Sequence, residues 1–214
     1  MKNQTSLLAV VCLLGAGLAA PAGAASLTYT LDRAIGIPDG NATVQVTLTD
    51  GASGGVDFDV TLLAGSEPLP DGAGITEFAF NIAPGADVWF RDISGLEAGW
   101  KAKPRARNGF GLFDAAVRAK QATLPVTNLQ FSVRPDDGTS VSLADLVSLS
   151  IGRALEGHSL FSARLAGMED GIVGASRVLL GGPSGATVVP LPASLWLLAS
   201  ALGMVGVMKR RLHG

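Results

Sequence analysis

Apolar and polar side chains alternate residue by residue through the middle of this chain, and this alternation restricts the fold more than any other feature. In 42–48 and 56–62, Ala, Val, Phe and Leu occupy every second position, with Thr, Gln and Asp between them. A strand places alternate residues on one face, whereas a helix scatters them around its axis. The Asp, Ser and Gly residues of 50–55 predict a hairpin loop that joins the two strands.

The same alternation recurs along the chain and predicts a series of short strands. It returns at Phe78, Phe80 and Ile82, at Val88 and Phe90, at Leu129, Phe131 and Val133, and at Phe161, Ala163 and Leu165. Two segments favour a helix instead: 140–149, where Ser140 or Ser142 would cap a turn, and 113–119. Many short strands and few helices predict a mainly β domain over 26–182, an antiparallel β-sandwich or jelly roll.

The N-terminal segment has the composition of a secretory signal peptide. Lys2 provides a positive charge, 7–18 is apolar, and small residues at Ala22 and Ala24 form a cleavage pattern. We expect a signal peptide over 1–25, cut after Ala24 or Ala25. The one cysteine of the chain lies within this segment, so the mature protein would contain no disulfide and no cysteine metal site.

The C-terminal segment predicts a single transmembrane helix. The run 191–208 contains no charged side chain, and at 1.5 Å per residue it would form a helix about 27 Å long, just enough to span the hydrocarbon core. The basic residues Lys209, Arg210 and Arg211 follow at once and would stay in the cytoplasm. The domain would then lie outside the cytoplasm, joined to the helix by a Pro-, Gly- and Ser-rich linker over 183–188.

The residues at the start of this tail form a short motif. The motif consists of Val189, Pro190, Leu191, Pro192 and Ala193. With the helix and the basic end, it makes 189–214 resemble the PEP-CTERM class of sorting signals, in its VPLPA-CTERM variant. This resemblance implies recognition by an exosortase, a membrane enzyme of Gram-negative bacteria, and a link to exopolysaccharide and biofilm matrix. The protein would be membrane-anchored, or released to the cell surface or matrix after the tail is processed.

The net charge of the middle of the chain argues against nucleic-acid binding. Four of the sixteen basic residues lie in the two ends, which leaves twelve against eighteen acidic residues in the middle of the chain, a formal net charge of −6. An acidic domain is poorly suited to nucleic acid.

One basic run stands out, with Lys101, Lys103, Arg105 and Arg107 at alternate positions. In an extended segment these charges would share one side and form an anion-binding patch for acidic exopolysaccharide or lipid headgroups; a solvated edge strand is the other interpretation.

Motifs for catalysis or metal binding are weak. His158 and Ser159 are adjacent, but no G-x-S-x-G elbow accompanies them. Asp57 and Asp59 share one strand face, and Asp136 and Asp137 precede a glycine in a turn, but no calcium-loop or paired-carboxylate motif surrounds them. We therefore expect no catalytic residue, no metal site and no cofactor.

Two hypotheses remain. The first is an exported, non-catalytic surface or matrix protein, sorted through its tail by an exosortase and in contact with membrane lipid. The alternative is a secreted carbohydrate-active or other hydrolytic enzyme with the same anchor. A pair of carboxylates facing one cleft would favour the enzyme, whereas carboxylates scattered over turns would favour the non-catalytic protein.

Overall fold

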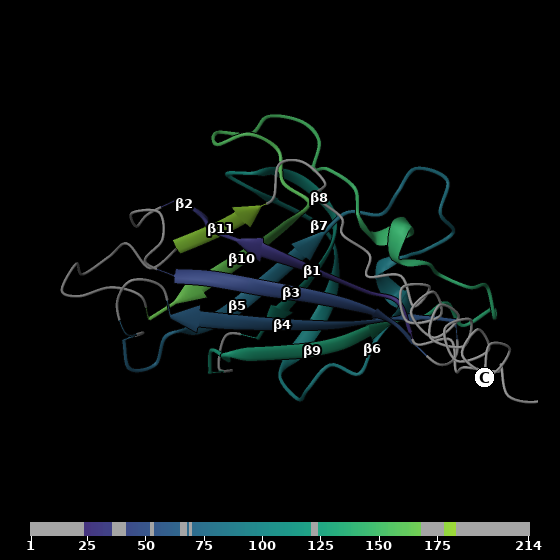
Figure 1. The fold of residues 1–214 in the computed structure, drawn as a ribbon, viewed down its shortest axis with the longest axis horizontal. Coiled ribbons are helices and arrows are strands. Elements are labelled where there is room, and N and C mark those ends of the chain that lie inside the picture. Colours follow the sequence, from purple (N-terminus) through teal and green to yellow (C-terminus); the bar gives the residue numbers. More distant parts are fainter. Residues whose placement is uncertain are drawn as a thin grey trace, which may run out of the picture. The chain divides into compact units, whose positions relative to one another are not determined.

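Two antiparallel sheets form the part of the chain that the computed structural model describes, which is residues 24–35, 42–51, 54–64, 68, 70–120, 124–167 and 178–182 (Figure 1). The first sheet has the order β1 (Ser26–Leu31), β3 (Ala42–Asp50), β4 (Val56–Ala64), β9 (Asn128–Val133) and β6 (Ile93–Ser94). The second has the order β2 (Arg33–Ile35), β11 (Val178–Gly182), β10 (Phe161–Ala166), β5 (Gly74–Phe80), β8 (Gly111–Ala119) and β7 (Trp100–Asn108). The prediction of a mainly β, antiparallel fold is confirmed.

The hairpin expected from the two clearest alternating segments is formed by β3 and β4. Val46 lies opposite Val60 in the ladder, and the alternating apolar residues of 42–48 and 56–62 are buried while the residues between them are half-buried or exposed. Directly opposed residues of an antiparallel pair share a face. The alternation of apolar residues therefore predicts both the two strands and the face of each strand that packs against the core.

Phenylalanine rings from both sheets fill the core between them. Phe58 and Phe131 of the first sheet stack with their ring centroids 4.6 Å apart, and Phe58 also lies 5.1 Å from Phe80 of the second sheet. Phe78 and Phe161, also from the second sheet, complete this aromatic cluster. Each such ring contributes about 1.5–3 kcal/mol by burial, and the contacts across the interface hold the two sheets face to face.

Two expectations about local structure are wrong, and a third, the turn capped by Ser142, is confirmed only over a shorter segment. Segment 113–119 is not helical but lies in β8, which pairs with both β5 and β7. Within 140–149 the helix is only the short 3-10 turn Leu143–Leu146, where the Asp145 carboxylate accepts hydrogen bonds from the main chain and hydroxyl of Ser142. The alternation at 88–90 does not form a strand, because a 3-10 turn begins at Phe90 (η1, Phe90–Asp92).

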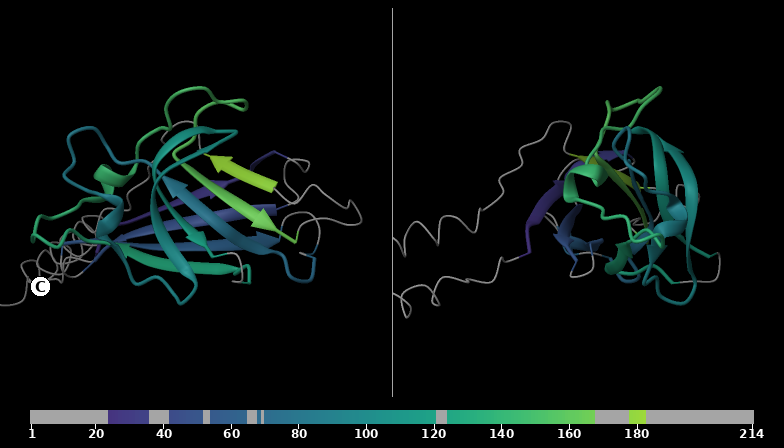
Figure 2. Two further views of the ribbon diagram at one scale, coloured as in Figure 1. Left: turned by 180° about the vertical axis from the view of Figure 1, so that it is seen from behind. Right: turned by 90° about the vertical axis from the view of Figure 1, so that its right-hand side faces the viewer.

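The β7–β8 hairpin curves over the outer face of the second sheet (Figure 2). Asn108 at the end of β7 donates a hydrogen bond of 2.8 Å to the hydroxyl of Ser162 on β10, although β8 and β5 separate these strands in the sheet. Phe110 at the hairpin turn packs with Ala79 and Ala116, residues of the outer face, in a second buried cluster. The outer face is therefore partly covered by its own edge strands.

Several sequence predictions fall outside the described residues. These are the signal peptide up to residue 23, the linker 183–188 and the sorting signal 189–214. Within the described ranges, no helix is long and apolar enough to cross a membrane. The first strand, β1, begins at Ser26.

Candidate functional site

Four basic side chains gather around one hollow on the outer face of the second sheet. Lys101 lies opposite Arg118 in the β7–β8 ladder, and Lys103 lies two residues further along the same strand, opposite Ala116. Lys120 follows β8, where its main-chain amide donates to the carbonyl of Gly99 at 2.7 Å. The hollow has a volume of about 260 Å³ and is lined by Lys101, Lys103, Arg118, Ala119 and Lys120. We call it the basic hollow.

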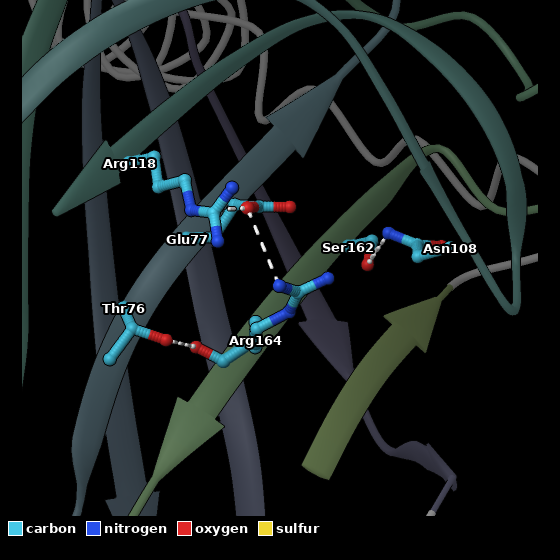
Figure 3. A network of polar contacts seen from close by, with 6 residues as sticks. All are labelled: Thr76, Glu77, Asn108, Arg118, Ser162 and Arg164. Carbon is cyan, nitrogen blue, oxygen red and sulfur yellow. Dashed lines mark hydrogen bonds and ion pairs between the residues drawn. The ribbon is translucent and has the colours of Figure 1, made fainter. Parts of the chain in front are cut away.

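The lining of the basic hollow contains no carboxylate. Glu77 on β5 forms an ion pair with Arg118, with Nε and Oε2 3.3 Å apart, and a longer one of 3.8 Å with Arg164 on β10 (Figure 3). Glu77 is buried, whereas the side chain of Arg118 remains 45% exposed. The carboxylate thus contacts the Nε side of the Arg118 guanidinium and leaves the Arg118 side chain accessible to solvent. The four positive charges repel one another in the hollow. A bound anion would relieve this repulsion and would be attracted by all four cations.

The strand that carries the predicted basic patch is irregular at its centre. Arg105 has a φ of 57°, in the left-handed region that side chains other than Gly rarely adopt, and no ladder pair joins it to β8. Beyond this point Phe113, opposite Ala106, is buried in the second cluster and not in the core between the sheets. Lys101 and Lys103 therefore line the basic hollow, whereas Arg105 and Arg107 lie outside its lining.

Arg118 and Lys120 are lining residues that no local sequence pattern predicts. Their signal is present only in the paired strands: β8 ends in Arg118 and Ala119, and Lys120 follows directly, an alternation that mirrors Lys101 and Lys103 across the hairpin. Identifying them from sequence requires the hairpin register.

Asp57 and Asp59 line one open groove on the outer face of the first sheet, with a volume of about 520 Å³. Their oxygens accept hydrogen bonds from the neighbouring strand β9: Ser132 donates to Asp57 at 2.6 Å, and Asn128 and Gln130 donate to Asp59 at 2.7 and 2.8 Å. Both carboxylates therefore belong to a network of strand residues. They also meet the condition that favours the enzyme hypothesis, because they face the same depression.

His158 and Ser159 do not contact each other as a catalytic pair in the hydrogen bonds of the described residues. Ser159 is fully buried and its hydroxyl accepts a hydrogen bond of 2.8 Å from Arg33. His158 Nδ1 instead lies 3.3 Å from the hydroxyl of Ser150, which is itself buried and donates to the carbonyl of Phe110. The Ser150 hydroxyl also accepts from the Ser159 amide at 3.1 Å. The Ser150 hydroxyl thus ties the 150–159 loop to the hairpin turn, and the Ser159 hydroxyl ties it to Arg33.

Asp136 and Asp137 lie in an exposed turn, as the sequence predicts. The amide of Thr139 donates to Asp137 Oδ1 at 2.9 Å, and this bond lowers the pKa of the Asp137 carboxyl from its ordinary value. Among the described residues, no group of three or more His, Cys, Asp and Glu side chains is arranged to hold a metal ion.

Comparisons with protein-family models, curated proteins and solved structures found no match to this chain. The predicted sorting motif, Val189 to Ala193, and the basic end, Lys209 to Arg211, lie outside the described residues. Function is therefore inferred from the residues of the tail and from the side chains on the outer faces of the two sheets.

Proposed function

We propose that this chain is an exported, non-catalytic surface or extracellular-matrix protein whose two-sheet domain binds acidic exopolysaccharide. The same proposal includes the signal peptide, the β-sandwich or jelly-roll assignment, the C-terminal transmembrane helix and the processing of 189–214 by an exosortase. The protein is held at the membrane, or is released to the cell surface after processing.

The basic hollow is the observation that carries the binding proposal. Three of its four cations lie on two adjacent strands and the fourth, Lys120, directly follows one of them, in a domain whose formal charge is strongly acidic, so they are not a consequence of a generally basic surface. A guanidinium and three ammonium groups suit carboxylate or sulfate groups, which accept charge-assisted hydrogen bonds from them. A polymer with one acidic group on each repeat would engage successive cations along β7 and β8.

Retention on immobilised alginate, an acidic polysaccharide, tests this proposal. Replacing Lys101 and Lys103 by Gln removes two charges from the lining of the basic hollow and should weaken binding about tenfold at low salt. The matched control, Arg105→Gln with Arg107→Gln, removes two charges from the same strand outside the hollow and should weaken binding by about twofold through long-range attraction alone. Equal weakening by both double variants, or a parent chain that alginate does not retain, contradicts the proposal.

The enzyme hypothesis remains a second candidate, because Asp57 and Asp59 line the same groove. A hydrolase acting through these carboxylates would release new reducing ends from a polysaccharide, and Asp57→Asn or Asp59→Asn would stop the release. The proposed non-catalytic function predicts no release by the parent chain from neutral or acidic polysaccharides. If the parent chain steadily releases reducing ends and either variant does not, the enzyme hypothesis replaces the proposed non-catalytic function.

A further inference from the structure

Trp89 exposes its indole to solvent. The side chain is 56% exposed, whereas the other aromatic side chains within the described ranges are buried or half-buried. An exposed indole forgoes the burial that dominates the energetics of aromatic residues, and Trp is enriched where one side of the ring contacts a partner. Its position therefore points to a ligand.

The backbone and ring of Trp89 are held in place. Its amide donates to Asp92 Oδ2 at 2.7 Å, and the amide of Asp92 donates back to the carbonyl of Trp89 at 2.9 Å. The indole Nε1 donates to Asp87 Oδ1 at 3.3 Å. Asp92 is buried, so these main-chain bonds hold the turn from which the ring projects, and the bond to Asp87 restrains the ring itself.

A hollow of about 310 Å³ lies beside this ring. It is lined by Trp89, Arg91, Pro135 and four aspartates, Asp87, Asp92, Asp136 and Asp137. A hydrogen bond of 2.8 Å from the Arg134 amide to the Asp92 carbonyl joins the two segments that form it. We call it the tryptophan hollow.

The charge around the tryptophan hollow favours a cation. One guanidinium faces four carboxylates, and the main-chain hydrogen bond from Thr139 lowers the pKa of Asp137 and so favours its charged form. The chain itself already places a cation on the ring, since the guanidinium carbon of Arg91 lies 5.6 Å from the indole centroid. Aromatic faces attract cations in this geometry.

We propose that the tryptophan hollow binds a hexosamine residue of a polysaccharide that carries free amines. The apolar face of the sugar ring packs on the indole, and the ammonium and hydroxyl groups donate to Asp136 and Asp137. The volume suits a sugar ring, which a simple alkylammonium group would leave largely unfilled. The ligand of this site is positively charged, whereas the ligand of the basic hollow is negatively charged. The site is independent of the function proposed above.

The test compares two ligands that differ chiefly in charge. Calorimetry of the full-length chain in mild detergent, at a pH where the amines are protonated, would use a glucosamine hexamer and its fully N-acetylated counterpart. The hexamer with free amines should bind about tenfold more tightly, and added salt should reduce the difference. Equal affinity for both oligomers overturns the proposal.

Three variants test the geometry. Trp89→Ala should abolish binding, and Asp136→Asn with Asp137→Asn should weaken it about tenfold. The control Asp71→Asn with Glu97→Gln removes the same charge from exposed sites outside the lining and should bind as the parent does. Arg91→Gln removes a competing cation and should strengthen binding. Weaker binding in Arg91→Gln, or full affinity in a Trp89→Ala chain with an unchanged unfolding temperature, overturns the proposal.

Discussion

Glu77 balances the charge at the centre of the outer face of the second sheet. It is buried between Arg118 and Arg164, with side chains that are 45% and 17% exposed. Glu77→Gln keeps the size of the side chain but removes its charge, so two guanidinium groups lose their shared carboxylate. We expect a loss of about 2 kcal/mol in the free energy of unfolding, less than for a fully buried pair because Arg118 is half exposed.

Urea unfolding measures this effect. Glu97→Gln, which makes the same chemical change at an exposed position, is the control and should leave the unfolding midpoint within error. A Glu77→Gln chain as stable as this control would show that the two ion pairs contribute nothing.

Arg105 is strained at the level of the backbone. A φ of 57° destabilises a residue that has a side chain by about 1–2 kcal/mol relative to Gly. The greater freedom of Gly in the unfolded chain partly offsets this difference. Arg105→Gly should therefore raise the free energy of unfolding by about 0.5 kcal/mol, whereas Arg107→Gly on the same strand should lower it by about 0.5–1 kcal/mol. Thermal unfolding of the two variants would give opposite shifts; a loss in both contradicts the assignment of strain to Arg105.

At the scale of elements, the curved β7–β8 hairpin depends on a glycine in β11. A Cβ at Gly181 would lie 2.7 Å from carbons of the Phe110 ring, closer than such contacts allow. Gly181→Ala should therefore push the hairpin turn off the outer face and destabilise the domain by about 1–3 kcal/mol. Amide hydrogen exchange would then be faster at Phe110 and Leu112, while β3 and β4 keep their protection. Unchanged exchange at the turn would mean that the hairpin does not dock there.

The elements that the sequence predicts are those buried on one face only. Segments 42–48 and 56–62 alternate cleanly because one face of β3 and β4 meets the core and the other meets solvent. The sequence of β8 resembles a helix because Ala115 and Val117 face the core between the sheets while Ala116 is covered by the second cluster. A strand buried on both faces has no two-residue alternation, so its apolar run cannot be told from a helix by periodicity.

The candidate sites were predictable only as far as they are local in sequence. Lys101 and Lys103 alternate within one strand, so the sequence indicates half of the basic hollow. Arg118 joins them through the register of a curved hairpin, which no local pattern specifies. The tryptophan hollow brings Trp89 beside Asp136 through the pairing of β6 with β9, a contact between distant segments.

At the scale of the whole molecule, the proposed function divides the chain into a polysaccharide-binding domain and a C-terminal sorting signal. The domain carries hollows of opposite charge, which suit different groups on a polysaccharide. The tail carries Pro190 and Pro192 at the entrance of an uncharged run, followed by basic residues. A simple anchor needs only the apolar helix and the basic end, because burial drives insertion and the positive charges set orientation. The prolines are therefore the residues that distinguish a signal from an anchor.

The most direct measurement of the central claim is the apparent mass and membrane fraction of the parent chain and of Pro190→Ala with Pro192→Ala, in cells with and without an exosortase. Proline removes main-chain donors and keeps the preceding chain extended, so the double variant should insert normally but escape processing. If the tail is a sorting signal, the parent is shortened and released only where the exosortase is present, and the other three samples hold an intact membrane-bound chain. One intact membrane-bound species in all four samples would show that the tail is an ordinary anchor and contradict the account.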